Sequence, residues 1–155
     1  MFNGVSMDAI DIYNLRSRMI SVSEQEPALL ADTLSYNLNL DRVGLVQSNK
    51  CVLENLTNAL GLKAYIESLP EQFDTVINES ATNISGGEKL KISIIRAILR
   101  NPDVIILDEP TSALDSQSRA ALRSYLDELK MSKIIIIISH DADFINESED
   151  TIIIL

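Results

Sequence analysis

Three short runs that are almost wholly apolar constrain the fold of this chain more than any other feature. They occupy residues 104–107, 134–138 and 151–155, and amphipathic helical patterns lie before and after the first of them. Strands with one solvated face alternate between polar and apolar residues, whereas an unbroken apolar run is typical of a parallel strand covered on both faces. Strands that follow helices in this order predict an α/β domain with a parallel sheet and flanking helices.

The predicted helices have clear ends. The first runs from residue 85 to Asn101-Pro102, with an apolar stripe of Leu90, Ile94 and Ile98. The second carries Leu122, Leu126 and Leu129 at helical spacing, with Asp115 or Ser116 available as its N-cap.

The first part of the chain predicts a strand and then a helical region. Residues 1–23 hold short apolar stretches between turn residues, and Met19–Ser23 alternates as a strand does. Pro27 then predicts a loop. Residues 30–69 have apolar residues at helical spacing, with Gly61 as a predicted helix end, and residues 71–84 look irregular.

Length and charge limit the functions that the chain can have. Its 155 residues suit one domain, and its formal net charge of −10 disfavours binding to nucleic acid, so no nucleic-acid partner is expected. The apolar runs are far too short to cross a membrane, so a membrane function requires a partner. Cys51 is the only cysteine, which excludes an internal disulfide, and we interpret it as a small buried side chain.

Asp108 and Glu109 are the first candidate site residues. They directly follow the apolar run 104–107, and open parallel sheets bind ligands at the carboxyl ends of their strands. Successive strand residues point to opposite sides, so one carboxylate can reach a metal while the other faces attacking water. Such a pair suits phosphoryl transfer assisted by Mg²⁺. A helix N-cap is the plainer explanation of the same two acids.

Three further candidates lie near strand ends or a helix start. The turn Ser85-Gly86-Gly87-Glu88 opens a helix, where free backbone N–H groups suit a phosphate, although a simple helix cap explains it too. His140 follows the run 134–138, and Gln25 follows the strand predicted at Met19–Ser23. Taken alone, His140 fits a site or a surface loop equally well, and a lone glutamine carries little information.

Together, in this order and spacing, these residues resemble the ATPase domain of ATP-binding-cassette (ABC) proteins over nearly the whole chain. Ser85-Gly86-Gly87-Glu88 is similar to the signature loop of that family, although Ile84 and Glu88 replace its usual leucine and glutamine. Asp108 and Glu109 resemble the Walker B aspartate and the catalytic glutamate. Ser112-Ala-Leu-Asp115 resembles the D-loop, His140 the switch histidine, and Gln25 the Q-loop glutamine.

The resemblance implies a set of ligands, partners and roles. ATP with Mg²⁺ would be held between two ABC ATPase domains. Asp108 and Gln25 would contact the metal. Glu109, His140 and Gln25 would serve catalysis. Nucleotide binding would involve Ser85, Gly86, Gly87, Glu88 and Asp115.

The resemblance also implies a transporter. Residues 69–79 resemble the segment that precedes the signature in exporter-type members and touches their membrane domain. This implies a transmembrane partner and a place on the cytoplasmic face of a membrane. Ser139-His140-Asp141 is more similar to importers and to soluble cassettes.

One element of the family is not found in these residues. The family begins with a strand, a Gly-x-x-x-x-Gly-Lys-Ser/Thr loop and a helix, whereas Met1–Asp11 already resembles the segment after that helix. The near-match Gly44–Cys51 has asparagine and cysteine at key positions and follows no apolar strand, so we interpret it as chance.

We therefore predict an incomplete P-loop NTPase (ABC ATPase) fold, inactive alone, with a parallel sheet, flanking helices and a helical subdomain. Residues 1–155 form a single partial domain, with the helical subdomain and its connection at about 30–84 and the core at 1–29 and 85–155. The strands 134–138 and 151–155 would lack a shared neighbour, and we expect them to pair directly or to associate with another chain.

Two other functions remain open from the sequence. One is a soluble ABC ATPase of the translation-factor or DNA-repair type, which the acidic charge and residues 75–79 argue against. The other is a non-catalytic cassette that only offers its signature loop to a complete partner. The intact acids disfavour that second function, and the missing loop favours it.

Overall fold

A computed structural model of the chain describes residues 11–39, 50–78 and 83–144. The strand predicted at residues 151–155 lies outside the described residues. So does most of the near-match loop, residues 44–49. The elements below belong to the described part.

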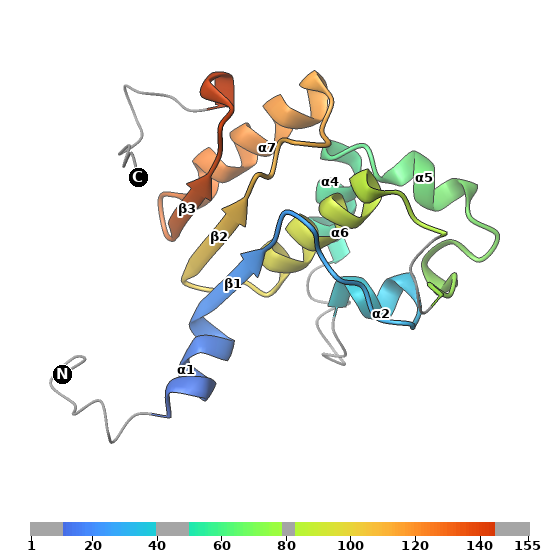
Figure 1. Ribbon diagram of the computed structural model, residues 1–155, viewed down its shortest axis with the longest axis horizontal. Helices are drawn as coiled ribbons and strands as arrows, with labels where there is room; N and C mark the ends of the chain where they lie inside the picture. The colour runs from blue at the N-terminus through green and yellow to red at the C-terminus, as the bar shows by residue number, and fades with distance from the viewer. Residues whose placement is uncertain (1–10, 40–49, 79–82, 145–155) are drawn as a thin grey trace, which may run out of the picture.

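The centre of the fold is a parallel sheet of three strands. β1 (Ile20–Ser23), β2 (Val104–Asp108) and β3 (Ile134–Ile138) lie in the order β1-β2-β3. Both pairs are parallel, and their register aligns Val22 with Ile106 and Ile106 with Ile136. All three strands therefore end at the same edge of the sheet, as the arrowheads in Figure 1 show. The strands predicted at Met19–Ser23, 104–107 and 134–138 and their parallel pairing are confirmed.

Two helices cover one face of this sheet. α6 (Gly86–Leu99) and α7 (Ser116–Leu129) are both close to their predicted positions. Ser85 caps α6 and Asp115 caps α7, each by accepting a backbone N–H bond from the residue three positions on. The two helices lie on the same side of the strands (Figure 1).

The remaining helices lie mostly to one side of the sheet. α2 (Leu34–Asn39), α4 (Lys50–Ala59), α5 (Lys63–Ser68) and the 3₁₀ turn η2 (Gln72–Asp74) form a group beside α6 (Figure 1). Gly61 has a φ of 64° and ends the pattern of α4, as predicted. A second 3₁₀ turn, η3 (Ala142–Phe144), follows β3.

The sequence did not predict α1 (Ile12–Met19), which immediately precedes β1. The prediction for this region was a series of short apolar stretches and turns. Asp11 caps the helix by accepting the Asn14 N–H at 3.1 Å, and Arg100 donates a hydrogen bond to the Ser17 carbonyl oxygen. The second bond crosses 83 positions of sequence, so no local pattern could indicate it.

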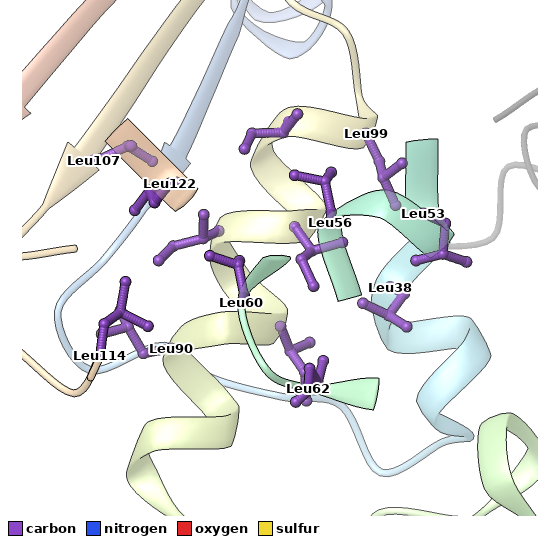
Figure 2. Packing of buried hydrophobic residues seen from close by; sticks show 14 of the residues in the cluster. Leu38, Leu53, Leu56, Leu60, Leu62, Leu90, Leu99, Leu107, Leu114 and Leu122 are labelled. Atoms are coloured by element: carbon purple, nitrogen blue, oxygen red, sulfur yellow. The ribbon is translucent and has the colours of Figure 1, made fainter. Parts of the chain in front are cut away.

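The core lies between α6, the sheet and the group of helices beside it. Ile92, Ile94 and Ile95 of α6 are fully buried. They share one hydrophobic cluster with Leu56 and Leu60, which come from the α4 region. Figure 2 shows Leu60 and Leu62 directed toward α6, and Leu90 close to Leu114. The predicted apolar stripe of α6 therefore joins the sheet to the helices of residues 34–74.

Two predictions about burial are wrong. Ile134, Ile136 and Ile138 were expected in a strand covered on both faces, but they are 62%, 44% and 49% exposed. They lie on the face of the sheet opposite α6 and α7, which none of the described helices covers. Cys51 was expected to be buried, but it lies on the exposed side of α4.

Candidate functional site

Glu109 occupies a sharp turn at the end of β2. Its φ is 46°, a left-handed conformation that side chains other than glycine rarely adopt. The Glu109 N–H donates to the Ile138 carbonyl oxygen at 2.8 Å, so the end of β3 holds this turn in place. Backbone strain of this kind costs about 1–3 kcal/mol and clusters at functional sites. The turn places the Glu109 side chain beside the segment that follows β3.

The carboxylate of Glu109 is held by the segment after β3. The His140 backbone N–H donates to Glu109 Oε1 at 3.0 Å, while His140 Nε2 lies 3.8 Å from the same oxygen. The Glu109 side chain is 16% exposed, and that of His140 is 99% exposed. The backbone of His140 therefore positions the carboxylate, while its imidazole is almost wholly exposed.

An ion pair positions the segment that carries His140. Arg119 Nη1 of α7 lies 3.0 Å from Asp141 Oδ2, and the Asp141 N–H donates to Ser139 Oγ at 3.0 Å. These bonds join α7 to the residues on both sides of His140. The structure thus brings Glu109 and His140 together, as their places at neighbouring strand ends predict.

The Ser85-Gly86-Gly87 turn has room on its outer side. Ser85 Oγ accepts the Glu88 N–H at 3.3 Å, which is an ordinary helix cap. A Cβ added to Gly86 would meet nothing within 4 Å, so packing within this chain does not require glycine there. A Cβ on Gly87 would lie 3.6 Å from Ala113 Cβ, which places this turn beside the segment before α7.

Asp115 and Gln25, two further candidate residues, have different surroundings in the structure. The Asp115 carboxylate accepts the Ser118 N–H at 2.7 Å, and this bond is the main cause that lowers the pKa of Asp115. Its visible contact is therefore the cap of α7. Gln25 lies two residues beyond β1, at the same edge of the sheet as Asp108, and it is exposed.

The acidic residues fit a magnesium ion that also binds phosphate. Mg²⁺ is usually held by one or two carboxylates together with water and phosphate oxygens. Asp108 is half-buried at the end of β2, and the described residues contain no group of three acids, histidines or cysteines able to form an all-protein metal site. A carboxylate at a strand end, such as that of Asp108, is one of the donors that a site of this kind uses.

Sequence reasoning missed Arg96, Asn37, Ser23 and Ser93. These four residues connect the loop of Gln25 to α6 through hydrogen bonds described below. Arg96 lies outside the apolar stripe of Leu90, Ile94 and Ile98, and a cation at such a position on a helix predicts a solvated side chain. The only available signal was an arginine between two apolar pairs, Ile94-Ile95 and Ala97-Ile98.

The parallel sheet, its flanking helices and the acidic pair at a strand end are the features of α/β nucleoside triphosphatases of the P-loop class. The family model described as "ABC transporter" matches residues 1–112. The chain therefore belongs to the ABC transporter family, whose members use ATP.

The relatives that this chain is similar to are transporters by name. It is 36% identical to the ATP-dependent lipid A-core flippase of Haemophilus influenzae over 99% of this chain and 26% of the flippase. It is 38% identical to ABC transporter B family member 4 of Dictyostelium discoideum over 89% of this chain and 18% of that protein. The chain thus spans about a quarter or less of the length of these relatives.

A solved structure confirms the fold. A bacterial Atm1-family ABC exporter with ATP bound superimposes with a TM-score of 0.70 and 26% sequence identity, over 81% of this chain and 22% of that one. None of the helices in the described residues combines the length and the apolar character that a membrane span requires.

Proposed function

We propose that residues 1–155 form part of the ATPase domain of an ABC exporter, in which ATP hydrolysis drives transport across a membrane. The observation that carries this proposal is the Glu109 carboxylate, held at the sheet edge by the His140 N–H. A strained turn that aims a carboxylate at the ligand-binding edge of a parallel sheet suits activation of water for phosphoryl transfer.

The residues at the strand ends would divide the chemistry between them. When bound, Mg²⁺ neutralises charge on the phosphates of ATP. Asp108 would hold the metal, with Gln25 as a further contact. Glu109 would orient water and accept its proton. The exposed imidazole of His140 would contact the γ-phosphate region, while its backbone keeps Glu109 in place.

The Ser85-Gly86-Gly87 turn would serve the nucleotide of a second ABC ATPase domain. Open space at the Cβ position of Gly86 allows another molecule to approach the backbone closely. The N-terminus of α6 carries free N–H groups and a partial positive charge, which favour a phosphate. Glu88 and Asp115 flank this region as the further nucleotide-binding residues of the proposal.

The proposal places the chain at the cytoplasmic face of a membrane, with a transmembrane partner. Val76, which forms a bridge with Thr33, and Leu30 are both exposed, and they lie within the helical subdomain that we assign to residues 30–84. Apolar side chains on such a loop surface suit contact with another protein. The substrate would be exported, in agreement with the lipid A-core flippase and the Atm1-family exporter to which the chain is similar.

The 155-residue chain by itself is expected to show no measurable affinity for Mg-ATP. The phosphate-binding loop and its lysine supply much of the binding in such enzymes, and these residues contain no Gly-x-x-x-x-Gly-Lys-Ser/Thr sequence. Titration calorimetry tests this. Micromolar binding that disappears in Lys50→Ala would contradict the prediction and assign a phosphate-binding role to the near-match Gly44–Cys51.

Ser85 is expected to act on the nucleotide of the other subunit. The test uses a flippase chimera, in which the segment of the H. influenzae flippase that directly precedes its matched region is joined ahead of Met1. Chimeras altered by Ser85→Ala and by Asp108→Asn are mixed, and ATPase activity is measured. One composite site per mixed dimer should be active, because the other site carries both defects, whereas each variant alone should be inactive. If each defect stays within its own subunit, the two-subunit site is wrong.

A second candidate function is a non-catalytic partner that lends its Ser85-Gly86-Gly87 turn to a complete cassette. The open space at Gly86 is compatible with it, because that space suits a partner whether or not this chain hydrolyses ATP. ATPase activity of the flippase chimera separates the two functions. The first predicts turnover by the chimera alone, whereas the second predicts turnover only after a complete cassette with a defective signature loop is added.

A further inference from the structure

The loop that carries Gln25 is hydrogen-bonded to α6 at both of its ends. At the first end, Ser23 Oγ donates to Ser93 Oγ at 3.0 Å, and both serines are buried. At the second end, Arg96 Nη1 donates to the Ala28 carbonyl oxygen at 3.4 Å. Ser93 and Arg96 are three positions apart, so both anchors lie on one face of the same helix. Gln25 lies between them.

Arg96 makes two more bonds just beyond this loop. Its Nε donates to the Asn37 carbonyl oxygen at 2.8 Å, and its Nη2 donates to Asn37 Oδ1 at 3.3 Å. All three acceptors of the guanidinium are neutral oxygens, and burial lowers the pKa of Arg96. A cation half-buried against neutral oxygens is costly, and the planar fork of arginine is the group that can satisfy all three.

Asn37 extends the attachment further along the same loop. It is fully buried in α2, and its Oδ1 accepts the Leu30 N–H at 2.8 Å. Its Nδ2 donates to the carbonyl oxygens of Leu30 and Thr33 at 2.9 and 3.0 Å. Arg96 therefore holds a side chain that itself fixes the shape of residues 30–33. The Arg96 guanidinium is therefore connected to the far end of the loop, both directly at Ala28 and through Asn37 at residues 30 and 33.

We propose that Arg96 is a positioning residue that, together with the Ser23–Ser93 bond, attaches the Gln25 loop rigidly to the helix beginning at the Ser85-Gly86-Gly87 turn. α6 is continuous from Gly86 to Leu99, so a displacement at its first turn moves both anchors of the loop. The two segments assigned to nucleotide contact would therefore move as one body. The functional side of this inference rests on the function proposed above, whereas the attachment itself does not.

The attachment is tested in the 155-residue chain with a nitroxide label at Glu26→Cys, in a Cys51→Ser background. Both native residues are exposed, so the label needs no change in the core. In the otherwise unchanged chain, the spectrum should be that of a restrained label. Arg96→Lys keeps the charge and loses the fork, so we expect loss of the restrained component.

Arg100→Lys is the matched control, because Arg100 lies one turn further along and bonds to Ser17 rather than to the loop. It should leave the spectrum unchanged. Ser93→Ala removes the first anchor without touching a charge and should also free the label, so the test remains decisive if Arg96→Lys does not fold. An unchanged spectrum in both loop-anchor variants, or equal loosening by Arg100→Lys, would overturn the proposal.

Activity of the flippase chimera gives the functional readout. A loop that has lost its position should misplace Gln25, so Arg96→Lys should lower kcat by on the order of 10²-fold with KM nearly unchanged. A loss confined to KM would overturn the positioning role. If the label behaves as predicted but the unaltered chimera hydrolyses no ATP, the proposed function fails and the attachment stands.

Discussion

Replacing Glu109 by glutamine in the flippase chimera is expected to lower ATP turnover by about 10²–10⁴-fold while ATP binding persists. The amide has nearly the shape of the carboxylate and can still accept the His140 N–H, which now binds Glu109 Oε1 at 3.0 Å. What the variant loses is the negative charge and the ability to take a proton from water. Steady-state ATPase assays and nucleotide-binding titrations on the same preparation measure the two effects separately.

Glu128→Gln is the matched control for this experiment. It makes the same chemical change on the exposed side of α7, away from the strand ends, and should leave turnover near that of the unaltered chimera. Turnover close to normal in Glu109→Gln would remove Glu109 from the catalytic role. A loss of ATP binding instead of turnover would assign it to holding the nucleotide.

The parallel sheet and its two covering helices could be predicted because their signals are local. An apolar run such as Val104–Leu107 and the stripe of α6 are visible within a few residues, and Asp115 and Ser85 cap the helices where their types suggest. The Glu109–His140 contact followed from one further rule, that parallel strands end at a common edge.

What could not be predicted depends on partners far away in sequence. An all-isoleucine run does not reveal whether both faces of β3 are covered, and the described helices cover only one. α1 depends partly on Arg100, and the Gln25 loop depends on Arg96, which bonds to Asn37 across 59 positions. Side-chain hydrogen bonds of this range leave no periodic signal, so Arg96 looked like any solvated cation.

The second large effect concerns the exposed isoleucines of β3. In the described part of the chain, β3 is an edge of the sheet, and it contains no charge, proline or bulge to block further pairing. A strand added at this edge would pair the free backbone groups of β3 and cover part of its isoleucine side chains. Full burial of one such side chain is worth about 1.5–3 kcal/mol, and a typical domain is stable by only about 5–15 kcal/mol. We therefore expect the 155-residue chain to cover this strand, either with its own residues 151–155 or by association with another chain.

Amide exchange and light scattering together distinguish the outcomes. Slow exchange along Ile134–Ile138 is expected in both cases, with a mass of 17.2 kDa for closure within the chain and a larger mass for association. Ile136→Lys should speed exchange and, where association occurs, restore the monomer, because Ile136 is the centre of the exposed row. Met131→Lys adds the same charge at an exposed position just before β3, and it should change neither the exchange rates along β3 nor the mass. A clean monomer with fast exchange of the β3 amides that point away from β2 would show that the chain tolerates an open isoleucine edge, because no second strand would then be paired with β3.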